Sequence, residues 1–122
     1  LSEKGVPIAM GCDIGGGQHA AVYRQVARAV QLSKLKEFYE PEGNGSITFA
    51  QAFHMATKAG GSVFDRAGSL EKGYRFNALV LDGLEDEGFT LSPEERAERF
   101  CYAGDDRNII GRFIDGKEII LP

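Results

Sequence analysis

A short apolar segment followed by a glycine-rich turn constrains the fold of this chain most. Residues 6–10 (VPIAM) are apolar without alternation, which is typical of a strand buried on both faces of a parallel sheet. Residues 11–17 (GCDIGGG) follow, and their glycines allow a tight turn around Asp13. The pattern predicts an α/β protein in which Asp13 stands at the C-terminal end of a strand, where barrel enzymes place catalytic groups.

Local patterns predict the other elements. Helical spacing of apolar residues, together with capping signals at Thr48, Ser92 and the Gly60-Gly61 pair, predicts four helical segments. These are residues 18–39, 48–61, 62–64 and 92–101. Strands are predicted over residues 74–82, 109–114 and 118–121. The Asp-Gly dipeptide at 115–116 predicts a hairpin turn between the last two strands.

Composition limits the partners and the compartment. The formal net charge is −4 and Lys and Arg do not cluster, so binding to nucleic acid or to an anionic membrane is disfavoured. We expect no membrane association, because no apolar run approaches the length of a membrane-spanning helix and no signal-peptide pattern begins the chain. Cys12 and Cys101 lie far apart in the sequence and predict two reduced thiols in a cytoplasmic protein.

Three segments occur in an order and spacing known from one family. They are residues 10–17 (MGCDIGGG), 67–73 (AGSLEKG) with 76–82 (FNALVLD), and 102–109 (YAGDDRNI) with 113–117 (FIDGK). Together they resemble the guanine deaminases of the amidohydrolase superfamily, over nearly the whole chain. Two positions depart from the pattern: Cys12 stands where the family more often has Thr or Ser, and Asn77 stands where the superfamily usually has Asp.

The resemblance implies the C-terminal fragment of a TIM-barrel metal-dependent hydrolase. Residues 1–66 would hold the last barrel strand and the C-terminal barrel helices. Residues 67–122 would hold strands of the flanking small β-sandwich domain with one inserted helix. The implied activity is the zinc-dependent hydrolysis of guanine to xanthine and ammonia in purine catabolism.

In the family, the aspartate that matches Asp13 ligates the metal and takes the proton from the metal-bound water, so the resemblance makes Asp13 both the metal ligand and the catalytic residue. The family's other ligands include a His-x-His pair, which this chain lacks, since it has two His in all. A catalytic zinc site needs three protein ligands. We therefore expect the isolated chain to be inactive and to bind no zinc, with guanine a partner of the intact enzyme.

Several residues have alternative interpretations. Asp13 could instead cap the following helix. His19 is a candidate for lining the substrate pocket, although a solvated histidine at a helix start is favoured. Residues 15–17 fit a structural turn better than a phosphate loop. For residues 105–107, a structural network in which Arg107 pairs with an aspartate is favoured over a metal site. A packing or surface role is favoured for His54.

Two other functions remain open from the sequence. A related amidohydrolase could act on another amino- or chloro-substituted ring. Alternatively, the chain could be a non-catalytic oligomerisation module, because residues 6–10 and the helix after them would expose apolar surface without neighbouring barrel strands. We expect a homo-oligomer in either case.

Overall fold

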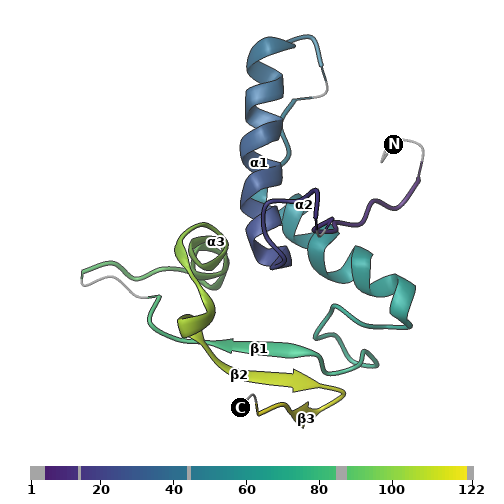
Figure 1. The fold of residues 1–122 in the computed structure, drawn as a ribbon, viewed down its shortest axis with the longest axis vertical. Coiled ribbons are helices and arrows are strands. Elements are labelled where there is room, and N and C mark those ends of the chain that lie inside the picture. Colours follow the sequence, from purple (N-terminus) through teal and green to yellow (C-terminus); the bar gives the residue numbers. More distant parts are fainter. Residues whose placement is uncertain (1–4, 14, 44, 85–87, 121–122) are drawn as a thin grey trace. The chain divides into compact units, whose positions relative to one another are not determined.

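The computed structural model describes residues 5–13, 15–43, 45–84 and 88–120, which fall into two compact units, Leu1–Gly60 and Gly61–Pro122. The first unit is helical and the second combines an antiparallel sheet with a helix (Figure 1). The chain therefore has the mixed α/β content that the sequence predicts. Along the described part of the chain, no helix is long and apolar enough to cross a membrane.

The first unit is built on two helices that contact each other, α1 (Val22–Tyr39) and α2 (Phe49–His54). One π-helical segment, η2 (Met55–Ala59), continues α2. The buried apolar residues of the two helices recur at helical spacing. They are Val26, Ala27 and Val30 on α1, and Phe49 and Ala52 on α2.

The two helices of this unit begin in different ways. Thr48 is the N-cap of α2, as predicted: its Oγ1 accepts a hydrogen bond from the Gln51 N–H at 3.2 Å, and Gln51 Oε1 accepts from the Thr48 N–H at 2.8 Å. By contrast, α1 begins at Val22 rather than at residue 18, and its N-cap Ala21 makes no side-chain cap. The predicted first turn of α1 is instead part of the preceding loop.

The predicted buried strand at residues 6–10 is not observed. This segment has no regular secondary structure, and Val6 is 47% exposed. A parallel strand needs at least one partner strand, and the described chain supplies none to this segment. Its backbone is instead joined to the second helix region, because the Met10 N–H donates to the Met55 carbonyl oxygen at 3.0 Å.

The predicted glycine cap at Gly60-Gly61 is also wrong. Gly60 and Gly61 both have right-handed helical φ values, −64° and −66°. The chain continues into a 3₁₀ turn, η3 (Ser62–Phe64), as predicted, and reverses at two left-handed residues, Asp65 and Arg66. At position 61 glycine is required by proximity, because a Cβ atom there would overlap the Ala67 carbonyl oxygen.

Three short strands of the second unit pair in the order β1-β2-β3, all antiparallel. They are β1 (Ala78–Leu81), β2 (Ile109–Ile114) and β3 (Lys117–Glu118). The first and third are shorter than predicted, and the predicted end at Leu121 lies outside the described residues. Between β1 and β2 the chain forms α3 (Pro93–Ala103) and the 3₁₀ turn η4 (Asp106–Asn108). Ser92 caps α3 with the predicted capping box.

The hairpin turn between β2 and β3 is anchored to the segment before β1. Asp115 and Gly116 both have positive φ, 52° and 76°, as a two-residue type I′ turn requires. The Asp115 N–H donates to Asn77 Oδ1 at 2.8 Å, and the Gly116 N–H donates to the Phe76 carbonyl oxygen at 2.9 Å. Arg75 binds the Asp115 carboxylate through both oxygens. We call this set of contacts the hairpin anchor.

Candidate active site

The turn that carries Asp13 is held by its own backbone. The Asp13 carbonyl oxygen accepts hydrogen bonds from the Gly16 N–H, at 3.0 Å, and from the Gly17 N–H. Asp13 itself has a left-handed backbone, with φ 45°, and Gly15 has φ 104°. We call residues 13–17 the Asp13 turn. Since two successive amides converge on one carbonyl oxygen, Gly16 and Gly17 are held close to Asp13.

The glycines of this turn leave space for its own atoms. A Cβ atom at Gly16 would lie 2.8 Å from Asp13 Oδ2, and a Cβ atom at Gly17 would overlap the Cys12 carbonyl oxygen. Any larger residue at position 17 would have to move the backbone, and one at position 16 would displace the Asp13 carboxylate. The glycine run is therefore a steric requirement for the placement of Asp13, in agreement with the structural interpretation of residues 15–17.

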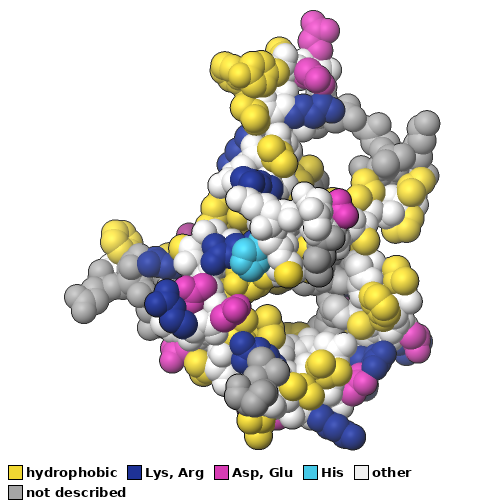
Figure 2. All heavy atoms as spheres, viewed as in Figure 1, with side chains coloured by type: hydrophobic (Ala, Val, Ile, Leu, Met, Phe, Trp, Pro, Cys, Tyr) yellow, Lys and Arg dark blue, Asp and Glu magenta, His cyan; other side chains and the backbone are white. Residues whose placement is uncertain are grey.

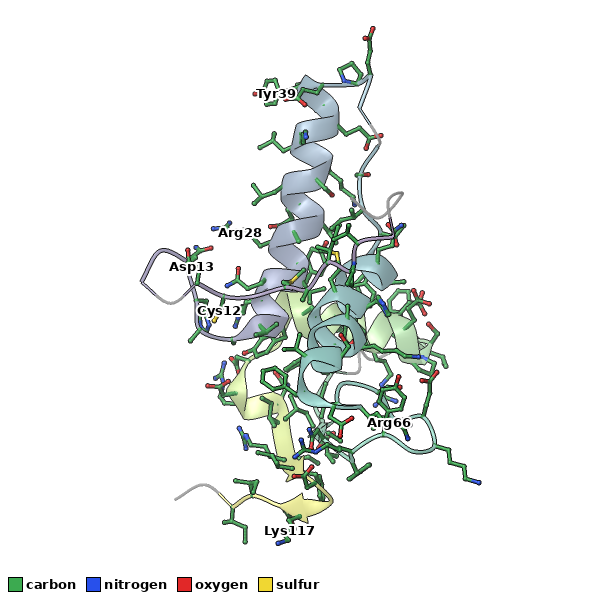
Figure 3. The ribbon with its side chains drawn as sticks, turned by 90° about the vertical axis from the view of Figure 1, so that its right-hand side faces the viewer. Cys12, Asp13, Arg28, Tyr39, Arg66 and Lys117 are labelled. Carbon is green, nitrogen blue, oxygen red and sulfur yellow. The ribbon has the colours of Figure 1, made fainter. Side chains whose placement is uncertain are left out.

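The Asp13 carboxylate is exposed and makes no hydrogen bond or ion pair with the residues that the structure describes. Figure 3 shows Asp13 on the loop that precedes α1, at the opposite end of that helix from Tyr39. The alternative role of Asp13 as a helix cap is not observed, because its carboxylate accepts no hydrogen bond from the described residues and the N-cap of α1 is Ala21. The carboxylate oxygens are free to meet a ligand from outside the described chain.

His19 lies between the Asp13 turn and α1. Its Nδ1 accepts a hydrogen bond from the Ala21 N–H at 3.0 Å, and the side chain is exposed. An imidazole that accepts at Nδ1 and is neutral carries its proton on Nε2. This contact matches the favoured interpretation of a solvated histidine at a helix start, and a substrate-binding role for His19 stays a prediction. His54 is exposed at the end of α2.

The residues present fit one part of a zinc site. A carboxylate oxygen is a common zinc ligand, and Asp13 offers one that has no competing partner among the described residues. Within residues 5–13, 15–43, 45–84 and 88–120, no three His, Cys, Asp or Glu side chains are grouped so that they could hold a metal. The described chain can thus contribute Asp13 to a metal centre whose other ligands come from elsewhere.

The third segment of the family resemblance is a structural junction. Arg107 Nη2 lies 2.6 Å from Asp105 Oδ2, which confirms the predicted ion pair. Asp105 also caps η4 by accepting from the Arg107 N–H at 2.9 Å. Asn108 joins this turn to the end of β1, because its Nδ2 donates to the Asp82 carbonyl oxygen at 2.9 Å. These residues secure the connection from α3 to β2.

The cysteines are both free, as predicted. Cys101 is buried, and burial, with a smaller contribution from Glu98, raises the pKa of its thiol to about 11. The thiol is therefore protonated and unreactive near neutral pH. A shallow hollow on α3 contains none of the predicted site residues. It is lined by Leu91, Glu95, Glu98, Arg99 and Tyr102.

The chain belongs to the amidohydrolase family, whose model matches residues 1–119. It is similar to guanine deaminases, as the sequence motifs indicate. It is 28% identical to the guanine deaminase of Dictyostelium discoideum over 96% of this chain, and 26% identical to that of Homo sapiens over 94%. The chain spans 28% of the length of each of these relatives.

Two solved structures share the fold. A guanine deaminase from C. acetobutylicum, with bound guanine in its active site, is 40% identical with a TM-score of 0.88. An E. coli guanine deaminase is 22% identical with a TM-score of 0.72. The alignments cover 98% and 97% of this chain, and 28% of each solved chain. The arrangement described above is therefore found within larger enzymes of the family.

Proposed function

We propose that the chain is the C-terminal part of a zinc-dependent guanine deaminase, which hydrolyses guanine to xanthine and ammonia. The observation that carries the proposal is the free Asp13 carboxylate on its glycine turn. The proposal is further supported by the similarity of the chain to a guanine deaminase with bound guanine, which is 40% identical over 98% of this chain.

Asp13 would act as a metal ligand and as the acid–base group. Zinc, when bound, lowers the pKa of a water molecule to about 7. The Asp13 carboxylate would accept the proton of the attacking water and later deliver it to the leaving amino group at C2 of guanine. An exposed carboxylate without a partner among the residues that the structure describes suits both steps, because neither oxygen has to give up a bond to them.

The proposal assigns a place to two parts of the chain, residues 1–66 and 67–122. Residues 6–10 would become the last strand of a TIM barrel once partner strands are present, and residues 1–66 would complete that barrel. Residues 67–122 would supply strands of a flanking β-sandwich. The exposed apolar side chains of Val6 and Ile110 are consistent with surfaces that further strands would cover.

We further propose a cytoplasmic, homo-oligomeric enzyme of purine catabolism. The second half of α1 exposes several large apolar side chains, visible along that helix in Figure 2. These are Leu32, Leu35, Phe38 and Tyr39. Sedimentation of the full-length protein tests this part, and a monomer at micromolar concentration would contradict it.

The direct test compares this chain with the full-length protein that contains it. With zinc and guanine, the full-length protein is expected to release xanthine, and the isolated chain to release none. Turnover by the isolated chain would contradict the proposal. If the full-length protein hydrolyses another amino- or chloro-substituted ring and not guanine, the related-amidohydrolase alternative is correct instead.

A further inference from the structure

Two hydrogen bonds link the loop after the Asp13 turn to α1. Gln25 Nε2 donates to the His19 carbonyl oxygen at 2.8 Å. Arg28 Nη2 donates to Gln18 Oε1. A further bond, within the loop, runs from the Ala21 N–H to His19 Nδ1 at 3.0 Å. Two side chains from the body of α1 therefore reach back to residues 18 and 19, which directly follow the Asp13 turn.

The side chains of Gln25 and Arg28 form these bonds with residues outside α1. Neither Gln25 nor Arg28 satisfies a backbone group of α1 through these bonds, because the acceptors lie in the preceding loop. The helix that carries them is fixed by the buried residues Val26 and Val30. Figure 3 shows Arg28 on the same side of α1 as Asp13 in that view. The contacts run from the anchored helix, through residues 18 and 19, to the turn.

We propose that Gln25 and Arg28 are positioning residues for Asp13. They hold residues 18 and 19 against α1, and so fix the orientation in which the Asp13 turn presents its carboxylate. The inference rests on the proposed function, since it assumes that Asp13 meets zinc. Residues that orient a metal ligand change metal affinity and turnover without touching the metal themselves.

The test uses the full-length protein and the double variant Gln25→Met/Arg28→Met. The matched control is Gln31→Met/Lys34→Met, the same chemical change at exposed positions of the same helix. The positioning variant is expected to lose about 10-fold in zinc affinity, measured against a competing chelator, and about 10-fold in kcat. KM for guanine should stay within about twofold, because neither side chain is proposed to touch the substrate. The control should match the wild-type protein.

Two further measurements separate positioning from simple stabilisation. Amide exchange at Gly16 and Gly17 should accelerate in the positioning variant and not in the control, because both amides belong to the Asp13 turn. Arg28→Lys, which keeps a cationic donor, should restore most of the Arg28→Met loss. If the double variant does not fold, Gln25→Met alone is expected to show about a threefold loss with the same pattern.

The outcomes are distinct. Equal zinc affinity, kcat and amide exchange in the positioning and control variants would overturn the inference and leave the role of Asp13 intact. If the positioning variant loses zinc only because it is partly unfolded, as a lower melting temperature would show, the inference is overturned as well. If Asp13→Asn retains zinc affinity and turnover, the proposed function itself fails, and the positioning role fails with it.

Discussion

Asp13 and Asp115 both have a positive φ angle and differ in what surrounds their carboxylates. Both are non-glycine residues with positive φ, 45° and 52°, in turns that contain glycine. Arg75 binds the Asp115 carboxylate through both oxygens, and Asn77 accepts the Asp115 N–H. The Asp13 carboxylate has no such partner among the residues described, and the Asp13 carbonyl oxygen accepts from the Gly16 and Gly17 amides.

The difference shows that local backbone geometry does not decide the use of a carboxylate. At Asp115, the guanidinium lowers the pKa of the carboxyl group and occupies its oxygens, so the group serves the hairpin anchor. At Asp13, glycines clear space for the carboxylate while backbone amides hold the turn. One turn uses its side chain for structure, and the other leaves it available for chemistry.

Replacing each aspartate by asparagine in the full-length protein tests the difference between the two carboxylates most directly. Asp13→Asn is expected to lower kcat by about 10²–10⁴-fold, because the amide cannot accept the proton and is a poorer metal ligand. Asp115→Asn should leave kcat within about threefold, since its losses are confined to the hairpin anchor. Steady-state release of xanthine measures both. A larger loss of kcat in Asp115→Asn than in Asp13→Asn would contradict the catalytic role of Asp13 and the structural role of Asp115.

The next largest effect is expected from alanine in the glycine run. Gly17→Ala should destabilise the protein by about 1–3 kcal/mol, because the new methyl group would overlap the Cys12 carbonyl oxygen. Gly11→Ala is the control, since a Cβ atom there has no neighbour within 4 Å. Denaturant unfolding measures the free energy. Equal stability of the two variants would show that the turn has more room than the structure indicates.

A smaller change should follow from Asn77, the position that departs from the superfamily pattern. Asn77→Ala removes the acceptor for the Asp115 N–H and is expected to cost about 1 kcal/mol. Asn77→Asp keeps an acceptor oxygen in place and should cost less. Thermal unfolding of both variants tests the order. If Asn77→Asp lowers the melting temperature as much as Asn77→Ala, the hydrogen bond to the Asp115 N–H is not the reason that Asn77 stabilises the protein.

Acidification should give the smallest effect. The Asp115 pKa is lowered in the folded chain, chiefly by the hydrogen bond from Arg75, so its contribution to stability is present above the unfolded pKa, about 3.9. It is lost as the pH falls from there through the lower folded pKa. The chemical shift of the Asp115 amide should follow this transition in wild type. In Arg75→Met, the midpoint should move towards the ordinary aspartate value.

The elements that the sequence predicts correctly depend on short-range signals. The N-cap at Thr48, the capping box at Ser92 and the Asp-Gly hairpin turn involve residues within a few positions of each other. The buried strand at residues 6–10 is not found, because its partners are not among the described residues. The helix end predicted at Gly60-Gly61 is not found, because both glycines keep right-handed φ values and Asp65 and Arg66 take the left-handed positions.

For the candidate site, the sequence indicates Asp13 and its glycines because they are contiguous. It does not indicate Gln25 or Arg28, whose partners lie in a loop that the periodicity assigns to the helix itself. No spacing rule connects a helical glutamine to a carbonyl group in the preceding loop. The hairpin anchor was missed for a related reason, since Arg75 and Asp115 are brought together only by the pairing of β1 with β2.

The bond from the Met10 amide to the Met55 carbonyl oxygen also bears on the order of folding. It closes a long loop, whose entropic cost is best offset once α1 and α2 have already docked. We therefore expect the segment leading to Asp13 to be among the last parts of its unit to gain protection in a pulse-labelling experiment, after the helices. Earlier protection of Met10 than of α1 would contradict this sequence of events.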